Sequence, residues 1–197
     1  MLVVSMSLVL MSLLPSPVSA GWLSNTWPAY NATPNSEAAR VLEIARAQLG
    51  DRFVLGASGP DAFDCSGLVW YAFKNAGLAD RMGGKRRGAR GYLKWFRNNL
   101  PKQVSRNLAD ARPGDILIWG DGHHSGIYIG DKWAISALNR RYDIRVHRAD
   151  RVGLPFTAVL MVNISRTGPG SIPTPTPSPT PAPSASQEAT PSTAPAG

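Results

Sequence analysis

Residues 63–69 read Phe-Asp-Cys-Ser-Gly-Leu-Val and contain Cys65, the only cysteine in this chain of 197 residues. Apolar residues then recur at helical spacing and Gly77 supplies a stop signal, which predicts a helix over residues 65–76. A lone cysteine cannot form a disulfide within its own chain. It is therefore either a small buried residue or a reactive one.

Residues 124–130 read His-Ser-Gly-Ile-Tyr-Ile-Gly and have the alternation of a strand. An earlier helix is predicted over residues 37–49, with Ser36 as its cap and Gly50 as its end. Strands are predicted over residues 115–119, 125–129, 133–137, 144–148 and 158–164. Because the helices come first and the strands follow, we expect an α+β fold in which the N-terminal helices pack on an antiparallel β-sheet.

The predicted helix gives Cys65 a chemical environment. A helix N-terminus favours a thiolate by about 1 kcal/mol, which lowers a pKa of about 8.5 by only roughly 0.7 unit. The helix alone therefore leaves most of the thiol protonated at neutral pH. A histidinium at His124 would supply the larger decrease in the pKa of Cys65.

The two ends of the chain differ in composition from the middle. Residues 1–20 are apolar and end in Val18-Ser19-Ala20, which predicts a signal peptide and a secreted or wall-associated protein; the alternative is an uncleaved N-terminal anchor. Residues 21–35 are interpreted as a linker. Residues 167–197 are rich in Pro, Thr, Ser and Ala and are predicted to form a disordered tail. A single domain over residues 36–166 remains, and we expect it to be a monomer.

Residues 81–112 carry ten lysines and arginines against Asp110 alone, whereas the formal charge of the whole chain is +8. Such a segment can bind nucleic acid, but an exported protein more readily meets anionic wall polymers or lipid headgroups. The simpler interpretation is a solvated helix face next to a loop. Neutralising Arg86, Arg87 and Arg90 would test binding to the wall.

Four blocks together resemble the NlpC/P60 family of cell-wall cysteine peptidases. They are residues 50–56 (Gly-Asp-Arg-Phe-Val-Leu-Gly), 63–69, 112–117 (Arg-Pro-Gly-Asp-Ile-Leu) and 124–130. The resemblance implies a papain-like α+β fold. It also implies an enzyme that hydrolyses the stem peptide of peptidoglycan, commonly between D-glutamate and a diamino acid. It implies no metal and no cofactor.

Carried over to this chain, the resemblance makes Cys65 the nucleophile and His124 the general base. Asp64 and Ser66 lie beside the nucleophile, where they contact substrate or shape the turn. The backbone N–H of Cys65 is a candidate oxyanion donor because it lies at a helix start.

Two positions depart from the family pattern. The third catalytic position is usually a larger polar residue and is Ser136 here; a hairpin turn at Gly130-Asp131 would place residue 136 opposite His124. Phe53 stands where the family commonly has tyrosine, in the substrate site. Losing a tyrosine hydroxyl near an oxyanion typically costs about 100- to 1000-fold in rate.

These departures keep other hypotheses open. The main one is a wall-binding module on the same fold with little or no catalysis. His147 or Asn139 could replace Ser136 as the third member, and acyl transfer uses the same pair of residues. A zinc site from His123, His124 and Cys65 lacks a fourth ligand, and consecutive histidines on a strand diverge.

Overall fold

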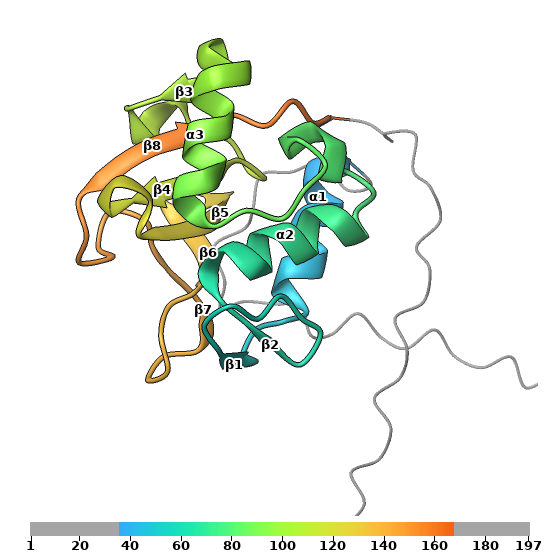
Figure 1. Ribbon diagram of the computed structural model, residues 1–197, viewed down its shortest axis with the longest axis vertical. Helices are drawn as coiled ribbons and strands as arrows, with labels where there is room; N and C mark the ends of the chain where they lie inside the picture. The colour runs from blue at the N-terminus through green and yellow to red at the C-terminus, as the bar shows by residue number, and fades with distance from the viewer. Residues whose placement is uncertain (1–35, 168–197) are drawn as a thin grey trace, which may run out of the picture.

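The computed structural model of the chain describes residues 36–167. The predicted signal peptide, the linker and nearly all of the predicted tail lie outside this range. The centre of the described part is a six-stranded antiparallel sheet with the strand order β3-β8-β4-β5-β6-β7 (Figure 1). Its strands are β3 (Val104–Ser105), β4 (Ile116–Trp119), β5 (His124–Gly130), β6 (Trp133–Ala137), β7 (Ile144–Arg148) and β8 (Phe156–Leu160).

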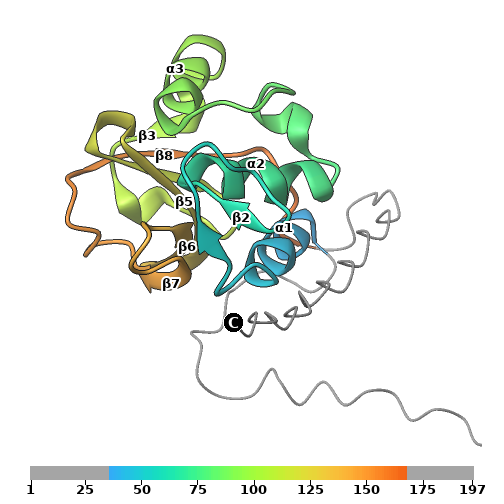
Figure 2. The ribbon, with the colours of Figure 1, turned by 60° about the horizontal axis from the view of Figure 1, so that its bottom comes forward.

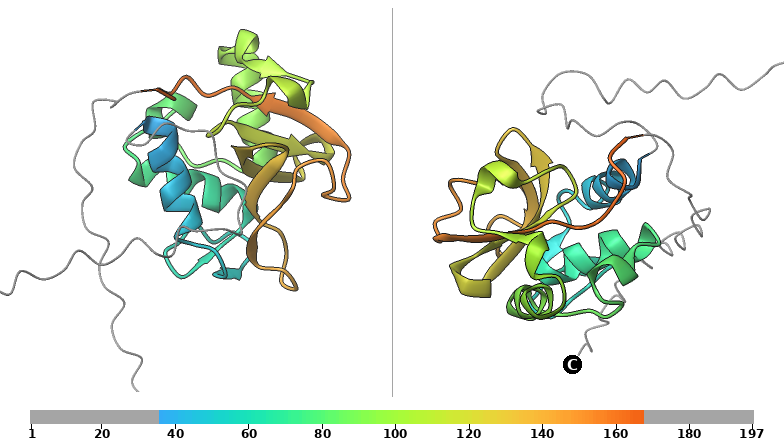
Figure 3. Two further views of the ribbon diagram at one scale, coloured as in Figure 1. Left: turned by 180° about the vertical axis from the view of Figure 1, so that it is seen from behind. Right: turned by 90° about the horizontal axis from the view of Figure 1, so that it is seen from above.

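Three α-helices accompany the sheet: α1 (Glu37–Arg46), α2 (Cys65–Asn75) and α3 (Ala89–Asn99). Helices α1 and α2 lie together on one side of the sheet, while α3 lies near β3 and β8 (Figures 1 and 3). Short 3₁₀ turns are η2 (Ala79–Met82), η3 (Pro101–Gln103), η4 (Leu108–Asp110) and η5 (Gly120–Gly122). The α+β prediction is confirmed.

A short parallel pair, β1 (Arg52–Phe53) and β2 (Ala62–Phe63), lies beside α2 near the β6–β7 end of the sheet (Figure 2). The backbone around residue 51 joins the two regions, because Gly50 N–H donates to Ile144 O and Ile144 N–H donates to Asp51 O. The chain that leads into α2 is thus attached to the strand that carries His147.

The two faces of the sheet have separate cores. The face that α1, α2 and α3 cover is lined by branched residues such as Ile118, Ile127 and Ile135, which are fully buried. The opposite face carries Trp119 and Tyr128, covered mainly by loops. Alternation along β5 places His124, Gly126 and Tyr128 on this second face.

The predicted helix boundaries need two corrections. Ser36 caps α1 as expected, its hydroxyl accepting from Ala39 N–H at 3.1 Å, but the helix ends at Arg46 and the chain continues in turns to Gly50. The basic segment contains a complete helix, α3, whose buried side chains are Ala89, Tyr92, Leu93 and Phe96. This segment therefore contributes to the core as well as to the surface.

Among the described residues, none of the helices combines the length and the apolar character that crossing a bilayer requires.

Candidate active site

Cys65 is the first residue of α2, as the sequence predicts, and the helix starts there because Asp64 caps it. Asp64 Oδ1 accepts from Gly67 N–H at 2.6 Å and from the Ser66 hydroxyl at 2.8 Å. Asp64 Oδ2 accepts from Gly56 N–H at 2.8 Å and from the Arg86 guanidinium at 2.9 Å. Four donors therefore occupy the carboxylate.

This network bears on the two roles expected of Asp64 and Ser66, contact with substrate or shaping of the turn. Both side chains are buried and bonded to each other, so their geometry is that of residues that shape the turn before the nucleophile. The Arg86 guanidinium also contacts Gly56 O at 3.3 Å and so joins the basic segment to the turn. No direct contact with substrate is needed to explain either residue.

The expectation that the helix end and a histidinium lower the pKa of Cys65 is wrong. Burial raises the pKa of the Cys65 thiol above its ordinary value, and the charge of Asp64 adds to this. The adjacent backbone and hydroxyl of Ser125 and the backbone of Ser66 oppose that increase in the pKa of Cys65 without cancelling it. The resting Cys65 side chain is therefore a thiol.

His124 is the first residue of β5 and is buried, 6% exposed. Its Nε2 lies 3.0 Å from Ser136 Oγ, so the predicted contact between these two residues is confirmed. Burial and the nearby His147 lower the pKa of His124 to about 4. The imidazole is therefore unprotonated at neutral pH and has the protonation state of a general base.

The pairing expected for this hairpin is wrong in register. Residue Ile127 lies opposite Ile135, and this register continues to place Gly126, rather than His124, opposite Ser136. The cause is the position of the turn, which lies at Asp131-Lys132, between the paired residues Gly130 and Trp133, rather than at Gly130-Asp131. The contact survives because His124 and Ser136 still share a face, and Gly126 has no side chain to separate them.

His147 lies on β7, opposite Ala134 of β6, and belongs to the same cluster. Its Nε2 is 2.6 Å from Ser136 Oγ, and its Nδ1 is 3.2 Å from Arg148 O. The Trp119 ring packs beside both imidazoles, with centroid distances of 5.4 Å to His124 and 6.0 Å to His147. Ser136 and His147, which the sequence analysis considers as alternatives for the third catalytic member, are therefore hydrogen-bonded to each other.

Asn139, the other alternative, is occupied elsewhere. Its Oδ1 accepts from the backbone N–H groups of Arg141 at 2.9 Å and Tyr142 at 3.2 Å, which closes the turn between β6 and β7. Asn139 therefore lines the site without supporting His124.

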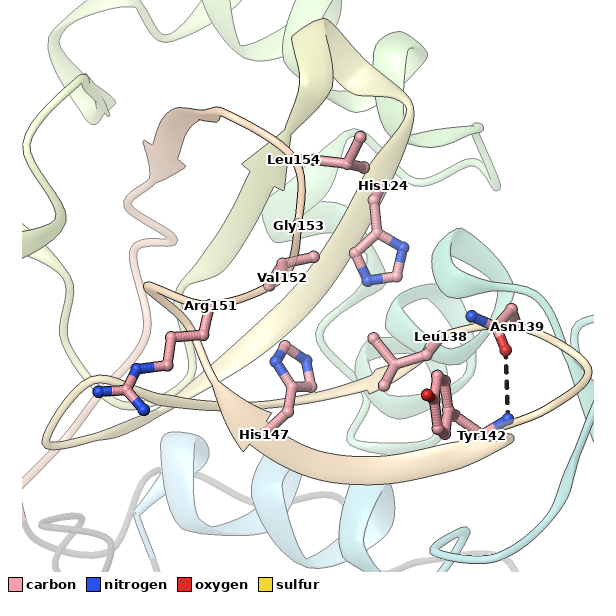
Figure 4. A pocket seen from close by; sticks show the side chains of 9 residues that line it. All are labelled: His124, Leu138, Asn139, Tyr142, His147, Arg151, Val152, Gly153 and Leu154. Atoms are coloured by element: carbon pink, nitrogen blue, oxygen red, sulfur yellow. Dashed lines mark hydrogen bonds between the residues drawn. The ribbon is translucent and has the colours of Figure 1, made fainter.

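A pocket of about 570 Å³ opens at His124 (Figure 4). The figure shows His124 and His147 pointing toward one another at its inner side, with one His124 nitrogen directed toward His147 and the other away from it. The lining residues are His124, Leu138, Asn139, Tyr142, His147, Arg151, Val152, Gly153 and Leu154. Arg151 is the one permanently charged residue in this set.

Two further predicted site residues, Cys65 and Phe53, are not among the residues that line this pocket. Within residues 36–167, no hydrogen bond connects Cys65 to His124; the thiol instead lies beside Ser125, the next residue of β5. Phe53 does not line the pocket at His124, and it packs half-buried against the core on the helix side. Its backbone N–H donates to Asp143 Oδ1 at 2.9 Å.

His123 lies just outside β5, and its Nε2 contacts the Arg90 guanidinium at 3.3 Å. It does not join His124 and Cys65. Among the described residues, no three His, Cys, Asp or Glu side chains are grouped so that they could hold a metal ion.

A family model described as "NlpC/P60 family" matches residues 50–159, which span the pairs β1–β2 and β4–β5, helix α2 and the cluster around Ser136. This chain belongs to the NlpC/P60 family. The match covers more than half of the chain, so the resemblance of the four sequence blocks is confirmed.

Relatives of this NlpC/P60 protein are named as endopeptidases. "Probable endopeptidase" of Mycobacterium tuberculosis is 33% identical over 114 residues, which are 57% of this chain and 26% of the relative. "Probable endopeptidase" of Corynebacterium glutamicum is 32% identical over 125 residues, 62% of this chain and 54% of the relative. The chain thus spans only part of the length of these relatives.

Solved structures agree on the fold. NlpC2 from Trichomonas vaginalis superimposes with a TM-score of 0.53 at 24% identity, covering 70% of this chain and 50% of that one. NlpC1 from the same organism gives a TM-score of 0.53 at 23% identity, covering 69% and 48%. At this identity the similarity establishes the NlpC/P60 fold.

Proposed function

We propose that this NlpC/P60 protein is an exported cysteine peptidase that hydrolyses peptidoglycan stem peptides, between D-glutamate and a diamino acid. The supporting observation is the neutral imidazole of His124, which is hydrogen-bonded to Ser136. His124 directly precedes Ser125, the residue that lies beside the Cys65 thiol. Both reacting side chains then come from regular elements, the start of α2 and the start of β5. The family membership and the named endopeptidases support the reaction class.

Because both resting groups are neutral, the reaction begins with general-base catalysis. His124 takes the thiol proton while Cys65 Sγ attacks the scissile carbonyl carbon. The tetrahedral intermediate collapses as His124 returns that proton to the leaving amine, which leaves a thioester on Cys65. Water then hydrolyses the thioester, with His124 again acting as base, and frees the thiol.

The developing oxyanion needs a donor, and the Cys65 backbone N–H supplies one. It lies at the first position of α2, where helix geometry provides no intrahelical acceptor. It also has no hydrogen-bond acceptor among residues 36–167. Phe53 contributes no hydroxyl to this role.

The test is release of stem-peptide fragments from purified wall by the protein and by Cys65→Ala. We expect release by the parent protein and none above background by the variant. Equal release by both would overturn the hydrolase proposal. If neither releases fragments but both bind wall, the domain is the wall-binding module.

We further propose that the exposed side of α3 binds anionic wall polymers. Arg97 is shared by two neighbouring hollows of about 300 Å³ each, one lined also by Arg90 and Lys94 and the other by Arg106. Phosphate-rich polymers complement such a cationic surface.

The structure changes the variants that test this idea. Arg86 is paired with Asp64, Arg87 contacts three backbone carbonyls and packs over Trp95, and Arg90 contacts Asp121 O at 3.2 Å. Neutralising these three residues would disturb the fold together with the charge.

A cleaner variant replaces Lys94, Arg97 and Arg106 by glutamine, and its matched control replaces the exposed Arg52, Lys74 and Lys132. We expect the first triple variant to elute from purified wall at lower salt and the control to elute like the parent protein. Equal elution of both variants would refute the α3 surface as the binding site.

A further inference from the structure

His124, Ser136 and His147 form a continuous chain of hydrogen bonds across three adjacent strands. The chain runs from His124 Nε2 to Ser136 Oγ at 3.0 Å, to His147 Nε2 at 2.6 Å, and from His147 Nδ1 to Arg148 O at 3.2 Å. Two small residues make it possible. Gly126 lies opposite Ser136 and Ala134 opposite His147, so the imidazoles reach Ser136 diagonally over positions without bulky side chains.

The hydrogen bond between His147 Nδ1 and Arg148 O determines which atom is the donor in each of the other hydrogen bonds of the series. A backbone carbonyl can only accept, so His147 Nδ1 carries the proton that it donates to Arg148 O. Burial lowers the pKa of His147, so its ring is neutral and its Nε2 is an acceptor. The Ser136 hydroxyl, with its one proton, therefore donates to His147.

The consequence reaches His124. Since Ser136 gives its proton to His147, its oxygen accepts from His124, and His124 Nε2 must carry a proton. In a neutral imidazole the other nitrogen, Nδ1, is then bare and available to accept. Figure 4 shows that this second nitrogen is directed away from His147.

We propose that His147 is a positioning residue that, through Ser136, holds His124 in the tautomer with a protonated Nε2 and a basic Nδ1. A serine alone does not select a tautomer, because a hydroxyl can equally donate to Nε2. His147 removes that ambiguity by accepting the hydroxyl proton of Ser136. The pair of Ser136 and His147 thus selects the His124 tautomer, as a larger polar residue at position 136 would. Trp119 does not compete, because its Nε1–H donates to Ala149 O at 2.9 Å.

The importance of this tautomer for catalysis rests on the proposed role of His124 as the base, but the tautomer itself is measurable without substrate. The ring ¹⁵N chemical shifts of His124, recorded at neutral pH on the full chain, report which nitrogen is protonated. We expect the Nε2–H form to account for more than about nine-tenths of the parent protein.

Three variants separate the proposal from a general packing role. His147→Gln keeps an acceptor near the position of Nε2, and we expect the tautomer to be retained. His147→Phe and Ser136→Ala break the chain, and we expect the Nδ1–H form to become detectable in both. A dominant Nδ1–H form in the parent protein, or an unchanged tautomer ratio in His147→Phe and Ser136→Ala, would overturn the proposal.

Activity on wall provides the second measurement. Losing one hydrogen bond of this kind corresponds to about a tenfold decrease in kcat/KM for His147→Phe, with most activity restored in His147→Gln. Adding His147→Phe to Ser136→Ala should change nothing further, because His147 acts through Ser136. Additive losses would contradict this order. If the parent protein releases no fragments while the ¹⁵N pattern holds, the proposed function fails and the tautomer assignment stands.

Discussion

At the scale of single residues, the candidate active site is built from neutral groups. The pKa of Cys65 is raised and the pKa of His124 is lowered, both mainly by burial. No carboxylate lies among the residues that line the pocket at His124, and the permanent charge there is the cation of Arg151. Nothing in this pocket stabilises a resting imidazolium, which distinguishes the site from a preformed thiolate–imidazolium pair.

This environment predicts the pH dependence of activity. A base works when it is unprotonated, so lowering the pKa of His124 from 6.5 to about 4 extends activity toward acid. We expect the acid limb of kcat/KM for a soluble stem peptide to have its midpoint near pH 4. Burial also lowers the pKa of His147, so the titration of His147 does not produce an acid limb of kcat/KM near neutral pH.

The measurement is kcat/KM at constant ionic strength, with circular dichroism at each pH to show that the protein stays folded. Rapid iodoacetamide labelling of Cys65 at pH 6, or an acid limb at pH 6.5 or above, would show that the site holds a thiolate–imidazolium pair instead.

At the scale of elements, the position of α2 depends on a close approach to the turn before it. A Cβ on Gly67 would lie 2.0 Å from Ala57 O and 2.9 Å from Ser58 Cα. These are backbone atoms, and the same turn provides the Ala57 carbonyl that accepts from Asp64 N–H at 2.9 Å. A side chain at position 67 would therefore push the first turn of α2 away from the Ala57–Ser58 backbone.

We expect Gly67→Ala to lower the free energy of unfolding by about 3 kcal/mol or more, because overpacking against backbone cannot relax by a rotamer change. Gly88→Ala is the matched control. It is the residue before α3, has φ of −69°, and a Cβ there would meet nothing within 4 Å. Its effect in urea unfolding should stay within about 0.5 kcal/mol. Equal effects of the two substitutions would refute the close approach.

The sequence predicts the helices and strands better than it predicts the register and the contacts between them. Helix α2 with Cys65 at its start, and five of the six strands of the sheet, follow from local periodicity and capping, whereas the two-residue strand β3 is not predicted. The register of β5 with β6 does not, because the turn lies at Asp131-Lys132 instead of at Gly130-Asp131. The contact between Ser136 and His147 needs the pairing of β6 with β7, which no local pattern specifies. The basic segment is interpreted as a solvated helix face next to a loop, but the bounds of α3 and its buried side are not predicted, because its many charges hide the apolar spacing of Tyr92, Leu93 and Phe96.

At the scale of the whole domain, the last described segment is held by a buried ion pair. Asp115 is fully buried at the start of β4; it pairs with Arg166 and accepts from Val162 N–H at 2.9 Å. Arg166 also donates to Ile164 O at 2.9 Å and Pro113 O at 3.1 Å. The Asp115 of the Arg-Pro-Gly-Asp block therefore has a structural role.

Replacing Arg166 by methionine should lower the free energy of unfolding by about 3–5 kcal/mol at pH 7, because it leaves a buried charge without its partner. The loss should shrink as the pH falls. Burial already raises the pKa of Asp115 to about 6, and removing Arg166 raises it further, so the variant gains stability when Asp115 takes up a proton. Urea unfolding at pH 5 and pH 7 measures both effects. Arg151→Met, at an exposed arginine, is the control, and a loss equal to that control would contradict the role of the pair.

The two ends of the domain are also bonded to each other. Ala38 N–H donates to Ser165 O at 3.0 Å, and Ser165 N–H donates to the Glu37 carboxylate at 2.6 Å. Whatever precedes Ser36 and whatever follows Thr167 are thus attached at one corner. Tension applied between these two attachment points would act first on the few bonds between α1 and the last segment, one after another. Because these bonds are loaded one at a time and do not share the force, the domain should unfold at a low pulling force even though its core is well packed.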